Sequence, residues 1–318
     1  MKSFAFVFPG QGSQAVGMLD AWAGHPAVVE TLREASDALG EDIAALIGNG
    51  PKEALALTTN TQPVMLVAGV AAWRAWLAEG GALPSVVAGH SLGEYSALVA
   101  AGVLTLAQAA PLVRFRAQAM QQAVPVGVGA MAAVMGMDAD RVRAGCAEAT
   151  SSFGPGSAEI VEAVNFNDPS QTVIAGSKAA VDRACEVLKA AGAKRALLLP
   201  VSAPFHSSLM RPAADALRGQ LASVDFAPPR IPVLNNIDVA VETDAERIRD
   251  ALVRQAAGPV RWVESVQALK ARGVEAIVEC GPGRILAGMV KRIAPELATG
   301  VVYDPATLAE TRQLLSNR

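Results

Sequence analysis

The chain has 318 residues, 52% of them apolar, with 27 basic and 30 acidic side chains and a formal net charge of −3. This length and apolar content are sufficient for one large domain or two, with a sizeable core. The absence of a basic surplus argues against nucleic acid as a partner, because there is no excess of cations to replace the counterions along phosphates.

Short apolar runs alternate with helical patterns along the chain, which predicts an α/β protein with a mostly parallel sheet. Strands are expected near Phe4, Val86, Ala132, Val164, Val173, Leu198, Val233, Ile277 and Val301. Helices with apolar faces that cover the sheet are expected over 64–78, 92–101, 106–122, 181–191, 213–221, 245–255 and 263–271. Pro111 has no amide hydrogen, so we expect it to kink or restart the helix at 106–122.

The chain shows no export signal and no membrane span. Residues 4–8 are β-like and follow Met1 and Lys2 directly, without a long apolar segment or cleavage site, so a cytoplasmic location is expected. The uncharged stretch 95–113 contains glycine, proline and polar residues, which favours buried helices over a span. Neither a disulfide framework nor a zinc site is indicated, and buried thiols are expected at Cys146, Cys185 and Cys280.

A G-x-S-x-G sequence at 89–93 lies between the β-like run 85–88 and the helical run 92–101. A sharp strand-to-helix turn of this kind lifts the hydroxyl of Ser91 above the sheet. The N–H of Leu92, at the start of the helix, is placed to stabilise negative charge on a carbonyl oxygen under attack. The motif can also arise by chance at a glycine turn, but its flanking pattern favours a serine nucleophile.

A serine nucleophile needs a base, and the chain has three histidines. His25 lies in an early polar stretch and is expected at the surface. His90 adjoins Ser91, but neighbouring side chains point in different directions, so His90 is expected to line the pocket. His206 follows the strand-like run 195–201, where the chain leaves the sheet. It is the predicted base, the alternative being a packed loop histidine.

Residues 128–200 depart from simple alternation of strands and helices. Their order is β-α-β-β-α-β, which predicts a small ferredoxin-like unit inserted into the larger domain, with a hinge at the glycine-rich turn 125–129. The expected division is a large subdomain of 1–127 and 201–318 and a small subdomain of 128–200. Ser91 and His206 would then face a cleft between the two.

The loop at 8–14 follows the first strand and contains Gly10 and Gly12. The next glycine is Gly17, so the spacing does not complete a G-x-G-x-x-G dinucleotide loop. The loop could simply be a glycine turn that starts a helix. Its functional interpretation is that close backbone approach brings the N–H of Gln11 to the cleft, as a second oxyanion donor beside Leu92.

Several motifs in the same order resemble those of the bacterial malonyl-CoA:acyl carrier protein transacylases, an acyltransferase family. They are FPGQGSQ at 8–14, TQP at 61–63, GHSLGEYSALVAAG at 89–102, Arg116 with Met120 and Gln121, GAM at 129–131, VNFN at 164–167, VIAG at 173–176, PFH at 204–206, Asn235 with Asn236, Gln255, and ECGPG at 279–283. The resemblance implies an α/β-hydrolase-like large subdomain with an inserted ferredoxin-like small one.

The resemblance also implies a reaction, in which Ser91 takes malonyl from coenzyme A as an ester and passes it to the phosphopantetheine thiol of acyl carrier protein, for fatty acid synthesis. His206 would be base and then acid, oriented by a backbone carbonyl near Gln255 rather than by an acidic residue. Arg116 would hold the malonyl carboxylate, for which its planar fork is suited. The neighbouring Arg114 is expected to be an ordinary solvated arginine.

The remaining residues implied by the resemblance line the pocket. They are Gln11, Gln62, His90, Phe205 and Gln255, with the amides of Gln11 and Leu92 as the oxyanion hole. In related polyketide acyltransferases an aromatic residue before the base accompanies malonyl rather than α-methylated substrates, because it fills the volume that a branch would need. Phe205 could also be no more than a packed loop aromatic.

Acyl carrier protein would be the partner, and it is acidic as a family. Two basic pairs near the subdomain edge are candidate docking residues or ordinary solvated charges: Lys194 with Arg195, and Lys291 with Arg292. A monomer without metal or prosthetic group is expected, coenzyme A being a substrate. A freestanding polyketide-synthase acyltransferase, a serine hydrolase or thioesterase, and a non-catalytic carrier-binding scaffold stay open as alternatives. A hydrolase would have no need of Arg116.

Overall fold

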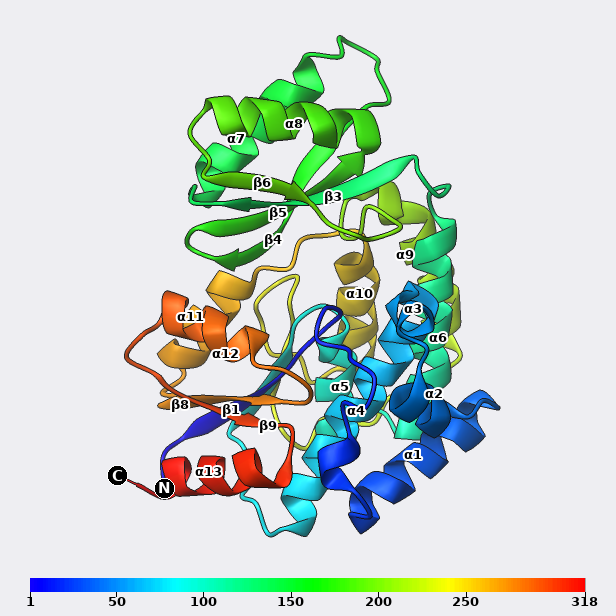
Figure 1. Cartoon of the computed structure of the whole chain (residues 1–318), viewed down its shortest axis with the longest axis vertical. Coiled ribbons are helices and arrows are strands. Elements are labelled where there is room, and N and C mark those ends of the chain that lie inside the picture. The colour runs from blue at the N-terminus through cyan, green and yellow to red at the C-terminus, as the bar shows by residue number, and fades with distance from the viewer. Residues whose placement is uncertain (318) are drawn as a thin grey trace.

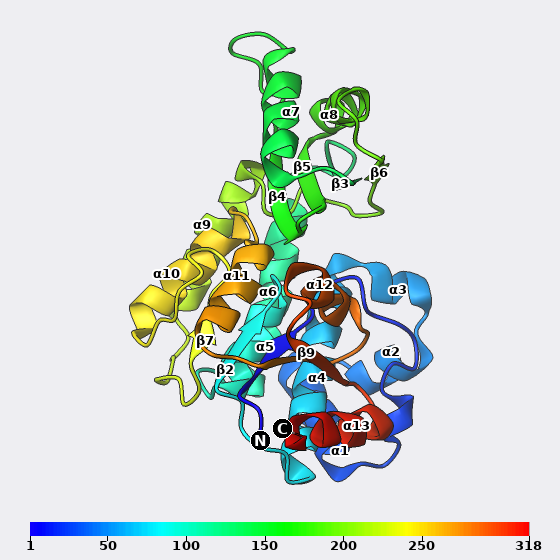
Figure 2. The ribbon, with the colours of Figure 1, turned by 90° about the vertical axis from the view of Figure 1, so that its left-hand side faces the viewer.

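Two β-sheets organise the chain, a five-stranded parallel sheet and a four-stranded antiparallel sheet. The computed structural model describes residues 1–317. In Figure 1 the antiparallel sheet and its helices lie above the larger part of the molecule, and Figure 2 shows the same separation from the side. The predicted α/β fold class is confirmed. No helix within residues 1–317 is long and apolar enough to cross a membrane.

The parallel sheet has the strand order β7-β2-β1-β8-β9. Its strands are β1 (Phe4–Phe8), β2 (Val86–Gly89), β7 (Val233–Leu234), β8 (Ala276–Cys280) and β9 (Ala298–Val302). Every residue of β1 is buried, because alternate side chains enter two different cores: Phe4, Phe6 and Phe8 pack on one face, and Ala5 and Val7 on the other. Helices on both faces therefore account for the unbroken apolar runs of these strands.

The helices around this sheet include several that the sequence patterns did not predict. They are α1 (Pro26–Leu39), α2 (Ile43–Asn49), α3 (Lys52–Ala56), α4 (Thr58–Ala78), α5 (Gly93–Ala100), α6 (Leu106–Gln122), α9 (Arg211–Ala222), α10 (Ala245–Ala256), α11 (Trp262–Ala271), α12 (Ile285–Ile293) and α13 (Pro305–Ser316), with 3-10 turns at Asp20–Trp22 and Ser208–Met210. Helix α4 is apolar nearly all round and is buried along most of its length, as such a helix must be.

Helix α6 runs through Pro111 without interruption, so the expected restart of the helix is wrong. Pro111 and Ala107, whose carbonyl loses its helical partner, are both exposed, so water can hydrate that carbonyl. Thr105 and Gln108 form a capping box that fixes the start of the helix. The helix that carries Arg116 is therefore continuous.

The antiparallel sheet has the order β4-β5-β3-β6. Its elements are β3 (Gly129–Met135), α7 (Ala139–Ser151), β4 (Val161–Asp168), β5 (Gln171–Ser177), α8 (Lys178–Ala190) and β6 (Arg195–Leu198), which is the predicted β-α-β-β-α-β order. Helices α7 and α8 cover one face. Strand β4 is tied to the larger part through Val260, whose N–H donates to Val164 (2.8 Å) and whose carbonyl accepts from Phe166 (3.0 Å).

Helix α13 lies against β9, the last strand of the parallel sheet. The hydroxyl of Thr311 donates to the carbonyl of Val301 (2.8 Å) and accepts from its N–H (3.2 Å). The hydroxyl of Thr307 accepts from the N–H of Tyr303 (3.2 Å). Side chains of α13 thus satisfy main-chain groups on the outer edge of this sheet.

The three cysteines are buried free thiols, as expected.

Candidate active site

Ser91 lies in the turn between β2 and α5, with a positive φ of 52°. The turn needs both of its flanking glycines. A Cβ on Gly89 would lie 1.9 Å from the main chain of Gly93, and a Cβ on Gly93 would lie 2.0 Å from the carbonyl oxygen of Phe8. Close packing of the first two strands against the start of α5 therefore produces the strained turn that presents the Ser91 hydroxyl.

His206 reaches the hydroxyl of Ser91, with its Nε2 lying 2.6 Å from Oγ. Its Nδ1 faces the main-chain oxygens of Gln255 (3.0 Å) and Gly258 (3.2 Å). These carbonyls can only accept, so Nδ1 carries the proton and Nε2 is left free to take the proton of the serine. The ring is therefore oriented by main-chain oxygens in the last turn of α10 and just after it.

Burial, and next the positive charge of Arg116, lower the pKa of His206 to about 3. The imidazole is consequently neutral at neutral pH, which is the state that a base requires. An anionic group bound to Arg116 would cancel part of that repulsion and raise the pKa of His206. Ligand charge and the basicity of the histidine are thus linked in this site.

Arg116 enters the site from α6 and is only 1% exposed. Its guanidinium donates to the side-chain oxygens of Gln62 (2.6 Å) and Gln255 (3.0 Å) and to Oγ of Ser91 (3.2 Å). It also lies over the ring of Tyr95, 5.5 Å from the centroid. All three acceptors are uncharged, so a buried cation lies beside the hydroxyl of Ser91 and has only neutral hydrogen-bond partners. Such a cation favours an anionic ligand.

These side chains line one pocket between the two sheets. Its lining consists of Gln11, Gln62, His90, Ser91, Leu92, Arg116, Met120, Met131, Asn165, Leu199, Val201, Phe205 and His206. The parallel-sheet part contributes the reactive groups, and the antiparallel sheet contributes Met131 and Asn165. The structure therefore brings together eight of the predicted site residues, and the ninth, Gln255, bonds directly to them.

The loop that carries Gln11 lies against the serine turn. A Cβ on Gly10 would be 2.7 Å from the main-chain oxygen of His90, so only glycine permits this approach. Within residues 1–317, the main-chain N–H groups of Gln11 and Leu92 donate to no other group of the protein. Both donors are available to an oxygen in the pocket.

His90 and Phe205 lie beside the reactive pair. Nε2 of His90 is 2.9 Å from Oδ1 of Asn167, and burial lowers the pKa of this histidine. His90 thus lines the pocket without bonding to the Ser91 hydroxyl. Phe205 is 8% exposed and packs in one apolar cluster with Met120 and Met131. Its ring therefore helps to bound the pocket next to the base.

The four candidate docking residues lie outside this pocket. Lys194 and Arg195 are exposed at the start of β6, and Lys291 and Arg292 are exposed near the end of α12. Arg292 donates to Asp168 at the end of β4 (2.6 Å), so it connects the parts built on the two sheets.

Arg114 differs from its expectation. Its side chain is 14% exposed, pairs with Glu41 and donates to Oδ1 of Asn60 (2.7 Å). The prediction that Arg114 is an ordinary solvated arginine is therefore wrong, because α6 turns this residue toward the loop between α1 and α2 and the first turn of α4.

Two residues of the site were not predicted, Glu94 and Asn236. Glu94 is 2% exposed, and burial raises its pKa to about 7. Asn236 follows β7 and its Nδ2 donates to the carbonyl of Gly89 (2.6 Å). The available signal for Glu94 was a single acid at the start of an otherwise apolar helix, directly after the serine motif.

Known proteins resemble this chain over nearly its whole length. The acyl transferase domain family matches residues 5–302. The malonyl CoA-acyl carrier protein transacylase of Salmonella typhimurium is 53% identical over 310 residues, which cover 97% of this chain and 98% of the relative. The relative of the same name from Escherichia coli K12 is 52% identical over 315 residues, 99% of this chain and 100% of its own.

Solved structures agree with these relatives. An acyl-carrier-protein S-malonyltransferase from Burkholderia pseudomallei has a TM-score of 0.95 and 64% identity, covering 98% of this chain and 100% of that one. A malonyl-transacylase solved in complex with a type II polyketide synthase acyl-carrier protein has a TM-score of 0.94 and 50% identity, covering 98% and 99%.

Proposed function

Because the chain belongs to the acyl transferase domain family, we propose that it transfers malonyl from malonyl-CoA to the phosphopantetheine thiol of acyl carrier protein and so supplies fatty acid synthesis. The observation that carries the proposal is the buried guanidinium of Arg116, 3.2 Å from the hydroxyl of Ser91, with three neutral acceptors. A carboxylate of the acyl group would complete this site. The names of relatives above 50% identity support malonyl as that group.

In the first half-reaction, Oγ of Ser91 attacks the thioester carbonyl while Nε2 of His206 takes its proton. The carbonyl oxygen becomes an anion that the N–H groups of Gln11 and Leu92 stabilise. The intermediate collapses with cleavage of the C–S bond, and the departing thiolate of coenzyme A takes the proton from His206. The product is a malonyl ester of Ser91.

The second half-reaction runs the same steps in reverse with the carrier thiol. His206 takes the proton of the phosphopantetheine thiol, the sulfur attacks the ester, and the C–O bond to Ser91 breaks. Oγ then recovers the proton from His206. Because one histidine serves both halves, coenzyme A and the carrier thiol must occupy the same place in turn.

Arg116 would select the acyl group. Its fork can bind a carboxylate through two parallel hydrogen bonds, and it lies deep enough that water competes weakly. Phe205 would select against a branch at the α-carbon by filling the volume beside His206. We therefore infer a preference for malonyl over acetyl and over methylmalonyl groups.

The test is intact-mass analysis after mixing the protein with malonyl-CoA, with acetyl-CoA as the comparison. Wild type should gain one malonyl group, and Ser91→Ala should gain none. Arg116→Ala should lose malonyl loading much more than acetyl loading. The adduct should be discharged by acyl carrier protein faster than by water. An adduct that water alone releases would identify a hydrolase and overturn the proposal.

A second candidate is service to a polyketide synthase. One structure at 50% identity is a malonyl-transacylase bound to a type II polyketide synthase carrier. The chemistry at Ser91 would be identical, so the two candidates differ only in the carrier. Competition between fatty acid and polyketide carrier proteins for the malonyl-enzyme distinguishes them.

We further propose that residues 128–200 form a subdomain inserted between 1–127 and 201–318.

For carrier docking, we propose that the protein uses the exposed basic residues Lys194, Arg195, Lys291 and Arg292. Docking by charge affects encounter more than chemistry. Lys291→Glu should therefore raise the KM for the acidic carrier by roughly threefold without slowing self-acylation by malonyl-CoA. Equal slowing of both steps would exclude a docking role.

A further inference from the structure

Glu94 is a buried acid that the transfer mechanism does not use, and it accepts two hydrogen bonds at one oxygen. Its Oε2 accepts from the main-chain N–H of Asn236 (2.9 Å) and from Nε2 of Gln255 (2.9 Å). Asn236 follows β7 and Gln255 lies in the last turn of α10. One carboxylate thus joins two segments that are distant from it in the sequence.

Both donors in turn hold the main chain of Ser91. Oδ1 of Asn236 accepts from the Ser91 N–H (2.7 Å), and Nε2 of Gln255 donates to the Ser91 carbonyl (3.0 Å). The two sides of the nucleophile are therefore clamped by residues that share Glu94 as an acceptor. A non-glycine residue with φ of 52° persists only where its surroundings fix it.

Glu94 also fixes which way round the side-chain amide of Gln255 lies. The nitrogen of that amide is occupied by two acceptors, Glu94 and the Ser91 carbonyl, so its oxygen faces the guanidinium of Arg116 (3.0 Å). If the amide rotated by half a turn, its NH₂ group would meet the donors of Arg116. An acceptor at the position of Glu94 prevents this rotation.

The spacing between the acid and the arginine has a consequence for binding. Glu94 is separated from Arg116 by the amide of Gln255, so the two charges attract without direct contact. A direct ion pair would set a second carboxylate against that of the substrate at Arg116. The amide of Gln255 is neutral and accepts one hydrogen bond from Nη2, so it is the weaker competitor for the guanidinium.

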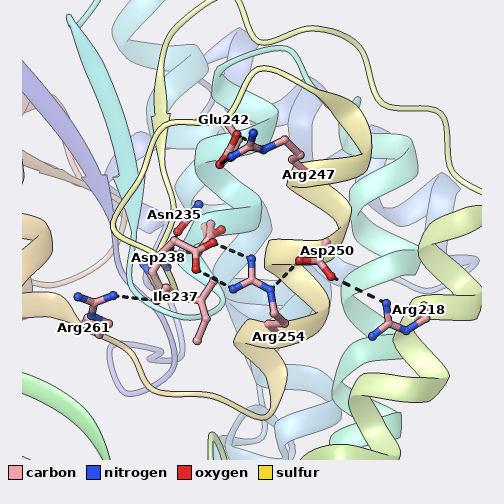
Figure 3. A network of polar contacts seen from close by, with 11 residues as sticks. Arg218, Asn235, Ile237, Asp238, Glu242, Arg247, Asp250, Arg254 and Arg261 are labelled. Carbon is pink, nitrogen blue, oxygen red and sulfur yellow. Dashed lines mark hydrogen bonds and ion pairs between the residues drawn. The ribbon is translucent and has the colours of Figure 1, made fainter.

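The two segments that Glu94 joins are also locked to each other at the surface (Figure 3). Asp238, two residues after Asn236, accepts two hydrogen bonds from Arg254, at 2.7 and 2.6 Å. Arg254 immediately precedes Gln255, and the N–H of Asp238 donates to Oδ1 of Asn235 (2.8 Å). The two donors to Glu94, Asn236 and Gln255, are thus also held together by a contact that does not involve the carboxylate of Glu94.

We propose that Glu94 is a positioning residue that sets the acyl preference of the site, by holding the Gln255 amide so that Arg116 is aimed at the substrate carboxylate. The inference rests on the proposed malonyl transfer. Glu94 touches neither substrate nor the reacting atoms, and it acts through Gln255. A change at Glu94 should therefore affect malonyl more than an acyl group that lacks a carboxylate.

The test compares single-turnover acylation of Ser91 by malonyl-CoA and by acetyl-CoA in wild type and Glu94→Met, which removes the acceptor and keeps the length of the side chain, followed by intact mass. The assay is run at pH 8, where the carboxyl of Glu94 is ionised, since its pKa is raised to about 7. The ratio of malonyl to acetyl rates should fall about tenfold, the effect expected from a misplaced hydrogen bond to a charged group.

Glu279→Met is the matched control. Glu279 is also fully buried, but its carboxylate accepts from the N–H of Ala287 at the start of α12, away from Arg116. Its acyl ratio should equal that of wild type. Glu94→Met/Gln255→Ala should show no lower ratio than Gln255→Ala alone, because Glu94 acts through that amide.

Equal slowing of malonyl and acetyl in Glu94→Met, with an unchanged ratio, would reduce Glu94 to a structural role and overturn the inference. If Glu94→Met does not fold, Glu94→Asp keeps the charge but retracts it by one methylene. An unchanged ratio in that variant overturns the inference, and a lowered ratio supports it. Absence of a malonyl adduct in wild type would instead contradict the proposed function itself.

Discussion

Ser91 and His206 meet at 2.6 Å through their side chains, and both have a left-handed main chain, with φ of 52° and 66°. This conformation is unfavourable for residues that carry a Cβ. The two reactive residues are thus both held in conformations that the surrounding bonds must enforce. The main chain of the catalytic pair stores strain that a more stable protein would lack.

Ser91→Gly should accordingly be more stable than Ser91→Ala by about 1 kcal/mol, because glycine adopts a positive φ without strain. Both variants lack the Ser91 hydroxyl and are expected to be inactive, so their stabilities are compared directly, by urea unfolding. Ser207 is the control, since it is buried and has a φ of −84°. There the order should reverse, with the alanine variant more stable. The same order at both positions would refute the strain argument.

Arg116→Ala should raise the pKa of His206, because the charge of Arg116 is the second cause of its depression after burial. The neutral histidine is the active form, so activity is lost as pH falls through this pKa. The acid limb of kcat/KM for acetyl transfer should therefore move to higher pH in the variant. Acetyl-CoA is used since Arg116 binds its acyl group least. Arg114→Ala, in which the lost cation pairs with Glu41 instead, should leave the limb in place.

Glu279 should make stability depend on pH. Burial raises its pKa from 4.5 to about 7, so the folded state binds the proton more tightly than the unfolded state. Proton binding by Glu279 therefore contributes roughly 3 kcal/mol to the free energy of unfolding. This contribution is fully present below pH 4.5 and is lost as pH rises through 7. Urea unfolding should show that the free energy of unfolding of Glu279→Gln, relative to that of wild type, is higher at pH 8 than at pH 5. If the difference in free energy between variant and wild type is the same at both pH values, Glu279 is not protonated in the folded protein.

Phe205→Ala should relax selection against a branched acyl group. Its ring packs with Met120 and Met131 beside the base, and truncation opens volume there. The rate of loading by methylmalonyl-CoA relative to malonyl-CoA should rise about tenfold, as expected for the discrimination of one methyl group. Phe226→Ala removes a ring that stacks on Arg249 elsewhere and should leave the ratio unchanged. If the ratio of methylmalonyl to malonyl loading is unchanged in Phe205→Ala, the ring of Phe205 contributes to packing and does not select the acyl group.

The strands were predictable because each is a short apolar run bounded by turn residues, and all nine lie where they were expected. The order of elements at 129–198 likewise identified the antiparallel unit. Helices α1 to α3, α12 and α13 were not predicted. Helices α2 and α3 have only seven and five residues, too few to establish a helical period. The restart at Pro111 was predicted wrongly, because the free-energy cost of the unpaired Ala107 carbonyl depends on whether water reaches it. The sequence alone does not show that Ala107 is exposed.

The pairing of Ser91 with His206 was also predictable, from one motif and from the scarcity of histidine. The bonds around them were not. Glu94 and Gln255 are 161 positions apart, and Arg116 and Gln255 are 139 apart. Only the folded arrangement shows that one amide serves the acid, the arginine and the nucleophile. Arg114 and Arg116 look alike in sequence, and α6 turns them to different neighbours.

The threonine contacts along β9 have a consequence for assembly. An exposed final strand can template pairing with a strand from another molecule, and such pairing starts many aggregates. Here the hydroxyls of Thr311 and Thr307 occupy the outward groups of Val301 and Tyr303. A foreign strand would first have to displace α13 from Val301, so the main-chain groups of this residue are withheld from pairing with another molecule.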